Sequence, residues 1–168
     1  MCEQVSQNSK RVVAAVNFNS PGQVVIAGHA DAVESAIDAL KESGAKRAMP
    51  LPVSAPFHTE LMRPAGEQLA LELAQIKLST PNIPVVHNVH AETETQPERI
   101  ASLLVEQIYS PVQWTRCVQT MVGQGAGRIV ECGPSKVLSG LNKRIDKSLE
   151  SFGLEEPDTL RAAVAELA

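Results

Sequence analysis

The sequence has few cysteines and no concentration of positive charge. Its three cysteines, Cys2, Cys117 and Cys132, cannot all pair, and their spacing fits no metal-binding motif. We therefore expect reduced thiols, as in a cytosolic protein. The formal net charge is −4 and the fifteen basic residues are dispersed, which argues against a nucleic acid or an anionic membrane as a partner.

Long apolar stretches are also absent. No run approaches the about 18 apolar residues that a membrane-spanning helix needs, and no basic segment followed by an apolar one begins the chain. The sequence has no internal repeat and no low-complexity segment. We expect a soluble, cytoplasmic protein, and 168 residues with 43% hydrophobic content are enough for one sizeable core.

What the sequence does contain is a clear hydrophobic periodicity. In its first part, strands are expected at 12–16, 23–27 and 45–53, and a helix at 31–43. The turn-forming NFNSPG separates the first two strands, and two prolines limit the third to a sheet edge. This β-β-α-β unit lacks the first β-α of a split βαββαβ fold. We therefore expect the chain to begin inside a subdomain, with CEQVSQNS as the end of a helix.

In its second part, helices alternate with short apolar strands. Helices are expected at 59–76, 97–108, 114–125, 136–145 and 157–167, and strands at 83–89 and 128–132. The continuous apolar run at 128–132 is typical of a parallel strand that is buried on both faces. This alternation indicates an α/β fold with a mostly parallel sheet.

One histidine lies where the expected helix 59–76 begins. In SAPFHTELMRP, His58 follows Pro56, which restricts the backbone that leads to it. The first turn of a helix presents unpaired N–H groups, a setting that favours the uncharged imidazole that a general base needs. His58 is therefore a candidate base, and the alternative is an ordinary surface histidine.

Such a base needs an acceptor for its second ring nitrogen. The helix 97–108 must end before Pro111, so its last carbonyls lack partners within the helix. One of them, at Gln107, could orient His58 and stabilise the imidazolium that forms when the base takes a proton. The alternative is that Gln107 is a solvated residue at a helix end.

No nucleophile for this base is evident. The G-x-S-x-G elbow that presents a serine in many α/β enzymes does not occur, and Ser135, in GPSK, is a weak candidate. His87 and His90 would point to opposite faces of the strand 83–89, so we expect no shared metal ion. His29 is expected at a helix start.

Five segments, in order and nearly covering the chain, carry a family resemblance. They are VNFNSPGQVVIAG, KRAMPLPVSAPFHTELMRP, PVVHNV, EQIYSPVQW and VECGPSKVLSGLNKRI. The chain resembles the C-terminal portion of the malonyl-CoA:acyl carrier protein transacylases of bacterial fatty-acid synthesis. That family has an α/β-hydrolase-like large subdomain with a ferredoxin-like small subdomain inserted. The resemblance implies that 1–53 form part of the small subdomain and 54–168 the C-terminal part of the large one.

The resemblance also implies roles for five residues. His58, in P-F-H, matches the catalytic histidine, and Gln107, in E-Q-I-Y, matches the residue whose main-chain carbonyl holds it. Asn17 and Asn19 match a segment near the acyl-CoA pocket, with an Asx turn as the alternative interpretation. Phe57 is expected to help shape the acyl pocket.

The family's nucleophilic serine, in G-H-S-x-G-E, has no counterpart here, and neither do its substrate-binding arginine and its early glutamine. Arg63 lies close to His58 in the sequence, but no motif supports it as that arginine. The resemblance implies transfer of a malonyl group from malonyl-CoA to the phosphopantetheine thiol of acyl carrier protein through a seryl ester, without metal or cofactor. The missing N-terminal half would supply the serine, so this chain alone is expected to be inactive. The alternatives are the acyltransferase module of a polyketide synthase and a non-catalytic fragment that binds a carrier protein.

Overall fold

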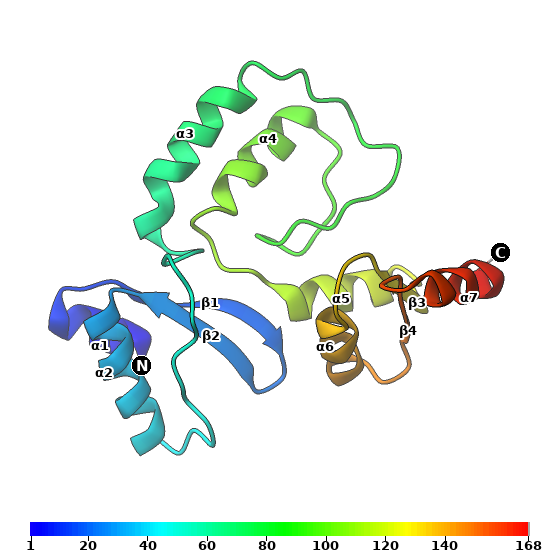
Figure 1. Ribbon diagram of the computed structural model, residues 1–168. Coiled ribbons are helices and arrows are strands. Elements are labelled where there is room, and N and C mark those ends of the chain that lie inside the picture. The colour runs from blue at the N-terminus through cyan, green and yellow to red at the C-terminus, as the bar shows by residue number, and fades with distance from the viewer. Residues whose placement is uncertain (168) are drawn as a thin grey trace.

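The computed structural model describes residues 1–167 and has a mixed α/β fold (Figure 1). Three groups of elements follow one another along the chain: a β-hairpin with two helices, a pair of helices above the hairpin in the view, and three helices with two short strands. No helix within this range is long and apolar enough to cross a membrane.

The hairpin consists of β1 (Val13–Ser20) and β2 (Gln23–Gly28), which pair antiparallel as the sequence predicted. A two-residue turn joins the strands, and its Gly22 has a φ of 77°. Glycine adopts this left-handed conformation without steric cost, which explains why the chain reverses there.

One expectation for this region is wrong. Asn17 and Asn19 lie within β1, and their side chains make no hydrogen bond among residues 1–167, so the alternative Asx turn is absent. The stretch pairs with β2 instead, with irregular register on either side of Asn17 and Phe18. Backbone pairing across the hairpin therefore prevails over the local turn preference of asparagine.

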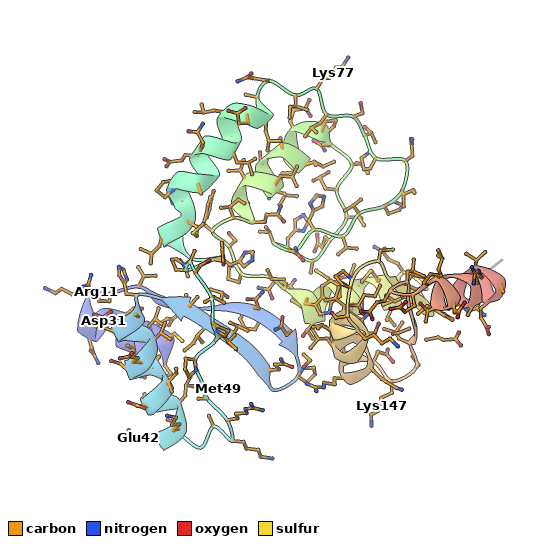
Figure 2. The ribbon with its side chains drawn as sticks, viewed as in Figure 1. Arg11, Asp31, Glu42, Met49, Lys77 and Lys147 are labelled. Atoms are coloured by element: carbon orange, nitrogen blue, oxygen red, sulfur yellow. The ribbon has the colours of Figure 1, made fainter. Side chains whose placement is uncertain are left out.

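Helices α1 (Cys2–Ser9) and α2 (Ala30–Glu42) pack on the hairpin. The core of this group consists of Val13, Ala32 and Ala36, with Cys2, Val5, Ile26 and Val33 packed around it. Figure 2 shows Arg11 beside Asp31 at its edge, where the two side chains form an exposed ion pair of 3.3 Å. Both expected helices of this group are present.

The start of α2 is fixed by contacts across the hairpin. His29 is its N-cap, as expected of a residue at a helix start, and its backbone N–H donates to Val12 O at 2.8 Å. The Val12 N–H donates in turn to His29 Nδ1 at 3.0 Å. A Cβ on Gly28 would lie only 2.0 Å from Val12 O, so this close approach requires glycine.

The second group contains the expected helices 59–76 and 97–108. The first begins as a 3-10 turn, η1 (Glu60–Met62), and continues as α3 (Arg63–Leu73), with Pro64 in its first turn. The second is α4 (Pro97–Glu106), which begins at a proline. Proline is tolerated at both places because the first N–H groups of a helix have no intrahelical partner. The two helices pack against each other.

The third group is built around a small parallel sheet. It contains α5 (Trp114–Gly123), β3 (Arg128–Glu131), α6 (Val137–Ile145), β4 (Glu150–Gly153) and α7 (Pro157–Leu167). β3 and β4 pair in parallel, as an α/β fold requires. The glycine-rich end of α5 is a helix terminus, where Gly125 has a φ of 97°.

A buried carboxylate fixes the start of α6. Glu131, at the end of β3, is 6% exposed. Its oxygens accept hydrogen bonds from the backbone N–H of Leu138 at 3.0 Å and from the N–H and hydroxyl of Ser139 at 2.8 and 2.6 Å. These bonds satisfy N–H groups that the first turn leaves without partners, and the Ser139 hydroxyl and the backbone N–H groups lower the pKa of Glu131.

Two expected strands are wrong. Residues 45–53 form no strand, and the side chains of Met49, Leu51 and Val53 are exposed, with Met49 on the connecting segment in Figure 2. Pro50 and Pro52 remove ladder donors, and no strand within residues 1–167 pairs with this stretch. The proposed division of the chain after residue 53 stays a prediction.

The stretch 83–89 is also not a strand. Its one bridge joins Val86 to Thr93, and Ile83 is 76% exposed. In β3 only Glu131 is buried, so burial on both faces is wrong for this sheet of two strands. β4, whose ESFG lacks an apolar run, was not expected from the sequence.

Candidate active site

His58 lies at the entry to η1 and α3 with a strained backbone. Its φ is 61°, a left-handed conformation that is uncommon for residues other than glycine, although asparagine, aspartate and histidine adopt it more often than the rest. The next residue, Thr59, is 2% exposed, and its hydroxyl donates to Pro56 O at 2.7 Å. The turn from Pro56 to Thr59 is therefore closed by its own hydrogen bond and directs the half-buried imidazole of His58.

The end of α4 holds His58 from the other side. The Nδ1 atom of His58 lies 2.8 Å from the main-chain oxygen of Gln107, and the His58 N–H donates to Ile108 O at 3.2 Å. Gln107 is the C-cap of α4, so its carbonyl is one of those that a helix end leaves without an intrahelical partner. The expected contact between His58 and this carbonyl is present.

That contact determines the state of the ring. A carbonyl oxygen can only accept, so in the uncharged ring the proton lies on Nδ1 and the lone pair on Nε2. Among residues 1–167, no group makes a hydrogen bond to His58 Nε2. The arrangement presents an oriented acceptor nitrogen, which is the geometry of a general base.

Asn17 and Asn19, two other expected site residues, lie on β1, which pairs with the segment after α4. Phe18 N–H donates to Val112 O at 2.9 Å and Val112 N–H donates to Val16 O at 2.8 Å. Asn17 therefore lies beside the same segment that holds His58. Asn19 lies further along β1, and neither asparagine makes a hydrogen bond to His58.

Phe57 precedes His58 and is 47% exposed. An aromatic ring with this exposure beside a base can line an apolar wall of a pocket. Its role is not tested by any contact within the described residues, and the catalytic and binding roles of all five residues stay predictions.

The remaining candidates do not form sites. Ser135 is exposed in a loop with a φ of 76°, and its N–H donates to Glu155 at 3.0 Å. The rings of His87 and His90 lie 5.9 Å apart, edge to face, so the expectation that they point apart is wrong. Still, no group of three metal-binding side chains occurs within residues 1–167. Burial lowers the pKa of His87, and neighbouring His90 adds to this shift.

Sequence reasoning missed the side-chain contacts made by Thr59, Arg63 and Tyr109, close to His58 and Gln107 along the chain. Arg63 pairs with Glu60, and its guanidinium lies 4.2 Å from the centroid of the Tyr109 ring. Thr59 had a visible signal, since a threonine directly before a helix is a frequent capping residue. Tyr109 had none, because its contacts are with residues that are distant in the sequence.

The comparison with protein families gives a clear result. A model described as the acyl transferase domain matches residues 2–163. The chain belongs to this family. It is 52% identical over 163 residues to the malonyl CoA-acyl carrier protein transacylase of Escherichia coli K12, a match that covers 97% of this chain and 52% of the relative. The corresponding protein of Bacillus subtilis is 42% identical over 156 residues, with 93% of this chain and 49% of the relative covered.

Solved structures agree with this acyltransferase fold. The malonyl-CoA:acyl carrier protein transacylase of Xanthomonas oryzae superposes with a TM-score of 0.93 at 48% identity, covering 98% of this chain and 53% of that one. A malonyl-transacylase in complex with a type II polyketide synthase acyl-carrier protein gives a TM-score of 0.94 at 47% identity, with coverages of 98% and 53%. The chain thus spans about half the length of the relatives it matches.

Proposed function

We propose that this chain carries the general base of a malonyl transfer from malonyl-CoA to the phosphopantetheine thiol of an acyl carrier protein. The observation that carries the proposal is the 2.8 Å contact between His58 Nδ1 and Gln107 O, which leaves Nε2 as an oriented acceptor. The choice of malonyl-CoA and acyl carrier protein is supported by the names of relatives at 52% and 48% identity.

In the proposed reaction, His58 Nε2 takes the proton of a serine hydroxyl as its oxygen attacks the malonyl thioester carbonyl. The imidazolium is stabilised by Gln107 O, which lies at the negative end of α4. Collapse of the tetrahedral intermediate breaks the carbon–sulfur bond, and His58 returns the proton to the leaving CoA thiolate. The carrier thiol then attacks the seryl ester with the same proton transfers in reverse order.

The serine belongs, in this proposal, to the half of the fold that this chain does not span. In support, no side-chain oxygen within residues 1–167 makes a hydrogen bond to His58 Nε2. This chain alone would then bind no acyl group covalently. Residues 1–53 and 54–168 would belong to the small and the large subdomain of the assembled enzyme.

The substrate contacts are proposed from position and chemistry. The exposed ring of Phe57 would form an apolar wall beside the malonyl thioester. The amides of Asn17 and Asn19 make no hydrogen bond within residues 1–167, so they are available to polar atoms of acyl-CoA. The mechanism requires no metal or cofactor, since a base and a nucleophile suffice for acyl transfer.

A second candidate is the acyltransferase function of a polyketide synthase. Its support is the resemblance to a malonyl-transacylase solved in complex with a type II polyketide synthase acyl-carrier protein, at 47% identity. The two functions share one chemistry and differ in the carrier. Rates of malonyl transfer to a fatty-acid carrier protein and to a polyketide carrier protein would separate them.

The test uses radiolabelled malonyl-CoA and the part of the Escherichia coli relative that this chain does not match. We expect no stable label on the chain alone, and a labelled serine on the added part once size-exclusion chromatography shows that the two have assembled. Label on this chain alone would contradict the proposed location of the serine. An assembled complex that takes no label would contradict the malonyl transfer function and favour a non-catalytic carrier-binding role.

A further inference from the structure

The contact between His58 and Gln107 joins the segment before η1 to the end of α4, near a groove between α3 and α4. The facing side chains of α3 and α4 are mostly small, and they leave a groove of about 430 Å³ lined by Ala70, Ala101 and Val105, among others. Tyr109 lies at this groove as well. The groove itself contributes few contacts that would hold the two ends together, so the 2.8 Å distance needs a local cause.

Tyr109 is placed to be that cause. It follows Gln107 and Ile108, whose two carbonyls hold His58. Its ring lies against Gly66 of α3, where an added Cβ would be 2.8 and 2.9 Å from ring carbons Cε1 and Cδ1. Glycine inside a helix costs about 0.5–1 kcal/mol relative to alanine, and here it allows the ring to approach the helix backbone.

A second contact of the ring, also from α3, is a cation. The Arg63 guanidinium lies 4.2 Å from the Tyr109 ring centroid, within the range of a cation–π interaction. Glu60 holds this guanidinium through two hydrogen bonds of 2.7 and 2.8 Å, from Nε and Nη2. Exposed ion pairs contribute little by themselves. The pair of Arg63 with Glu60 instead keeps the guanidinium in place beside the Tyr109 ring.

We propose that Tyr109 is a positioning residue for His58, because its ring, in contact with both Gly66 and Arg63 of α3, fixes the start of α3 to the end of α4. Tyr109 contacts neither substrate nor reacting atoms in this account. It acts through the backbone of the two residues before it: the Gln107 carbonyl sets the tautomer of the imidazole, and the Ile108 carbonyl holds the backbone of His58. The inference rests on the proposed role of His58 as the base.

The first test is nuclear magnetic resonance of the full chain, labelled with ¹⁵N at histidine. In the wild type we expect His58 to be protonated at Nδ1, with slow exchange of that proton with water. In Tyr109→Leu this exchange should be about tenfold faster, the factor that a lost ring contact of about 1.4 kcal/mol gives. Tyr109→Phe keeps the ring and should restore exchange to within about twofold of the wild type.

A matched pair of exposed variants covers the case in which Tyr109→Leu does not fold. Arg63→Gln removes the cation at the ring, and Arg161→Gln removes a more exposed i,i+3 ion pair on α7. The first should speed exchange of the His58 Nδ1 proton by about two- to fivefold, as expected for an exposed cation–π contact. The second should leave it unchanged.

Two results would overturn the proposal. One is a folded Tyr109→Leu variant with the wild-type tautomer and exchange rate at His58. The other, should that variant not fold, is identical exchange in Arg63→Gln and Arg161→Gln. These readouts need no turnover, so failure of malonyl transfer would remove the proposed function and leave the test of Tyr109 intact. In an assembled active enzyme, Tyr109→Leu should lower kcat about tenfold with little change in KM.

Discussion

The imidazole of His58 is held by the main chain of Gln107 and not by a side chain. The carbonyl at 2.8 Å comes from a helix end, where an oxygen without an intrahelical partner is available. In many hydrolases a buried carboxylate has this orienting role. A neutral carbonyl can fix the same tautomer without placing a second charge next to the base.

A main-chain contact predicts tolerance at position 107. Gln107→Ala should leave the malonyl transfer rate of the assembled enzyme within about threefold of the wild type, because the carbonyl is retained and alanine is a good helix former. Steady-state rates with malonyl-CoA and carrier protein would measure this. A loss as large as that caused by removing His58 would mean that the side-chain amide of Gln107, and not its main-chain carbonyl, orients the base.

The backbone of His58 predicts a difference between two variants that both lack the imidazole. At a φ of 61°, asparagine is tolerated but alanine is strained, so His58→Ala should be less stable than His58→Asn by about 1 kcal/mol. Urea unfolding of the two chains gives the difference directly. Equal stability would show that the left-handed conformation at this position carries no strain.

The junction between β2 and α2 predicts a strong glycine requirement. Gly28→Ala would place a Cβ 2.0 Å from Val12 O, which is backbone and cannot move aside, so we expect a loss of at least about 3 kcal/mol in unfolding free energy. Gly22→Ala is the control: it also has positive φ but no atom within 4 Å, and should cost only about 1 kcal/mol. Similar losses for both would contradict the close contact.

Glu131 predicts a pH dependence of stability. Its pKa is lowered below the usual 4.5, first by the Ser139 hydroxyl, so the folded state favours the carboxylate. The stabilisation is therefore fully present above about pH 4.5 and is lost as the pH falls through the lower folded-state pKa. Glu131→Gln should cost about 1–2 kcal/mol at neutral pH and should remove this part of the acid dependence.

Urea unfolding at several pH values from about 7 to about 3 would measure both effects. Glu34→Gln, at an exposed carboxylate on α2, serves as the control and should change neither. A Glu131→Gln chain with the wild-type dependence on pH would mean that the bonds to Leu138 and Ser139 do not hold the carboxylate in its charged form.

The sequence was sufficient where local chemistry decides the structure. The helices 97–108 and 114–125 follow from their periodicity and their terminal proline and glycine residues, and the hairpin follows from its turn. The helix that must end before Pro111 predicted free carbonyls, and the family resemblance identified the one at Gln107 as the partner of His58. For the helices and the hairpin, the signal lies within a few residues.

The sequence was insufficient where a segment depends on a partner that is distant in the chain. The stretches 45–53 and 83–89 have apolar side chains suited to strands, but nothing among residues 1–167 pairs with either over its length, and Val53 and Ile83 are largely exposed. Strand formation depends on cross-strand partners more than on intrinsic preference. The contact of Tyr109 with Gly66 was likewise invisible, because only the packing of α3 on α4 creates it.

The most direct test of the central claim is the single-turnover rate of malonyl transfer to serine in the enzyme assembled from this chain and the unmatched part of its Escherichia coli relative. If His58 is the base, His58→Asn should lower this rate by about 10²–10⁴ while the complex still assembles. A rate within about threefold of the wild type would contradict the claim that His58 activates the nucleophile.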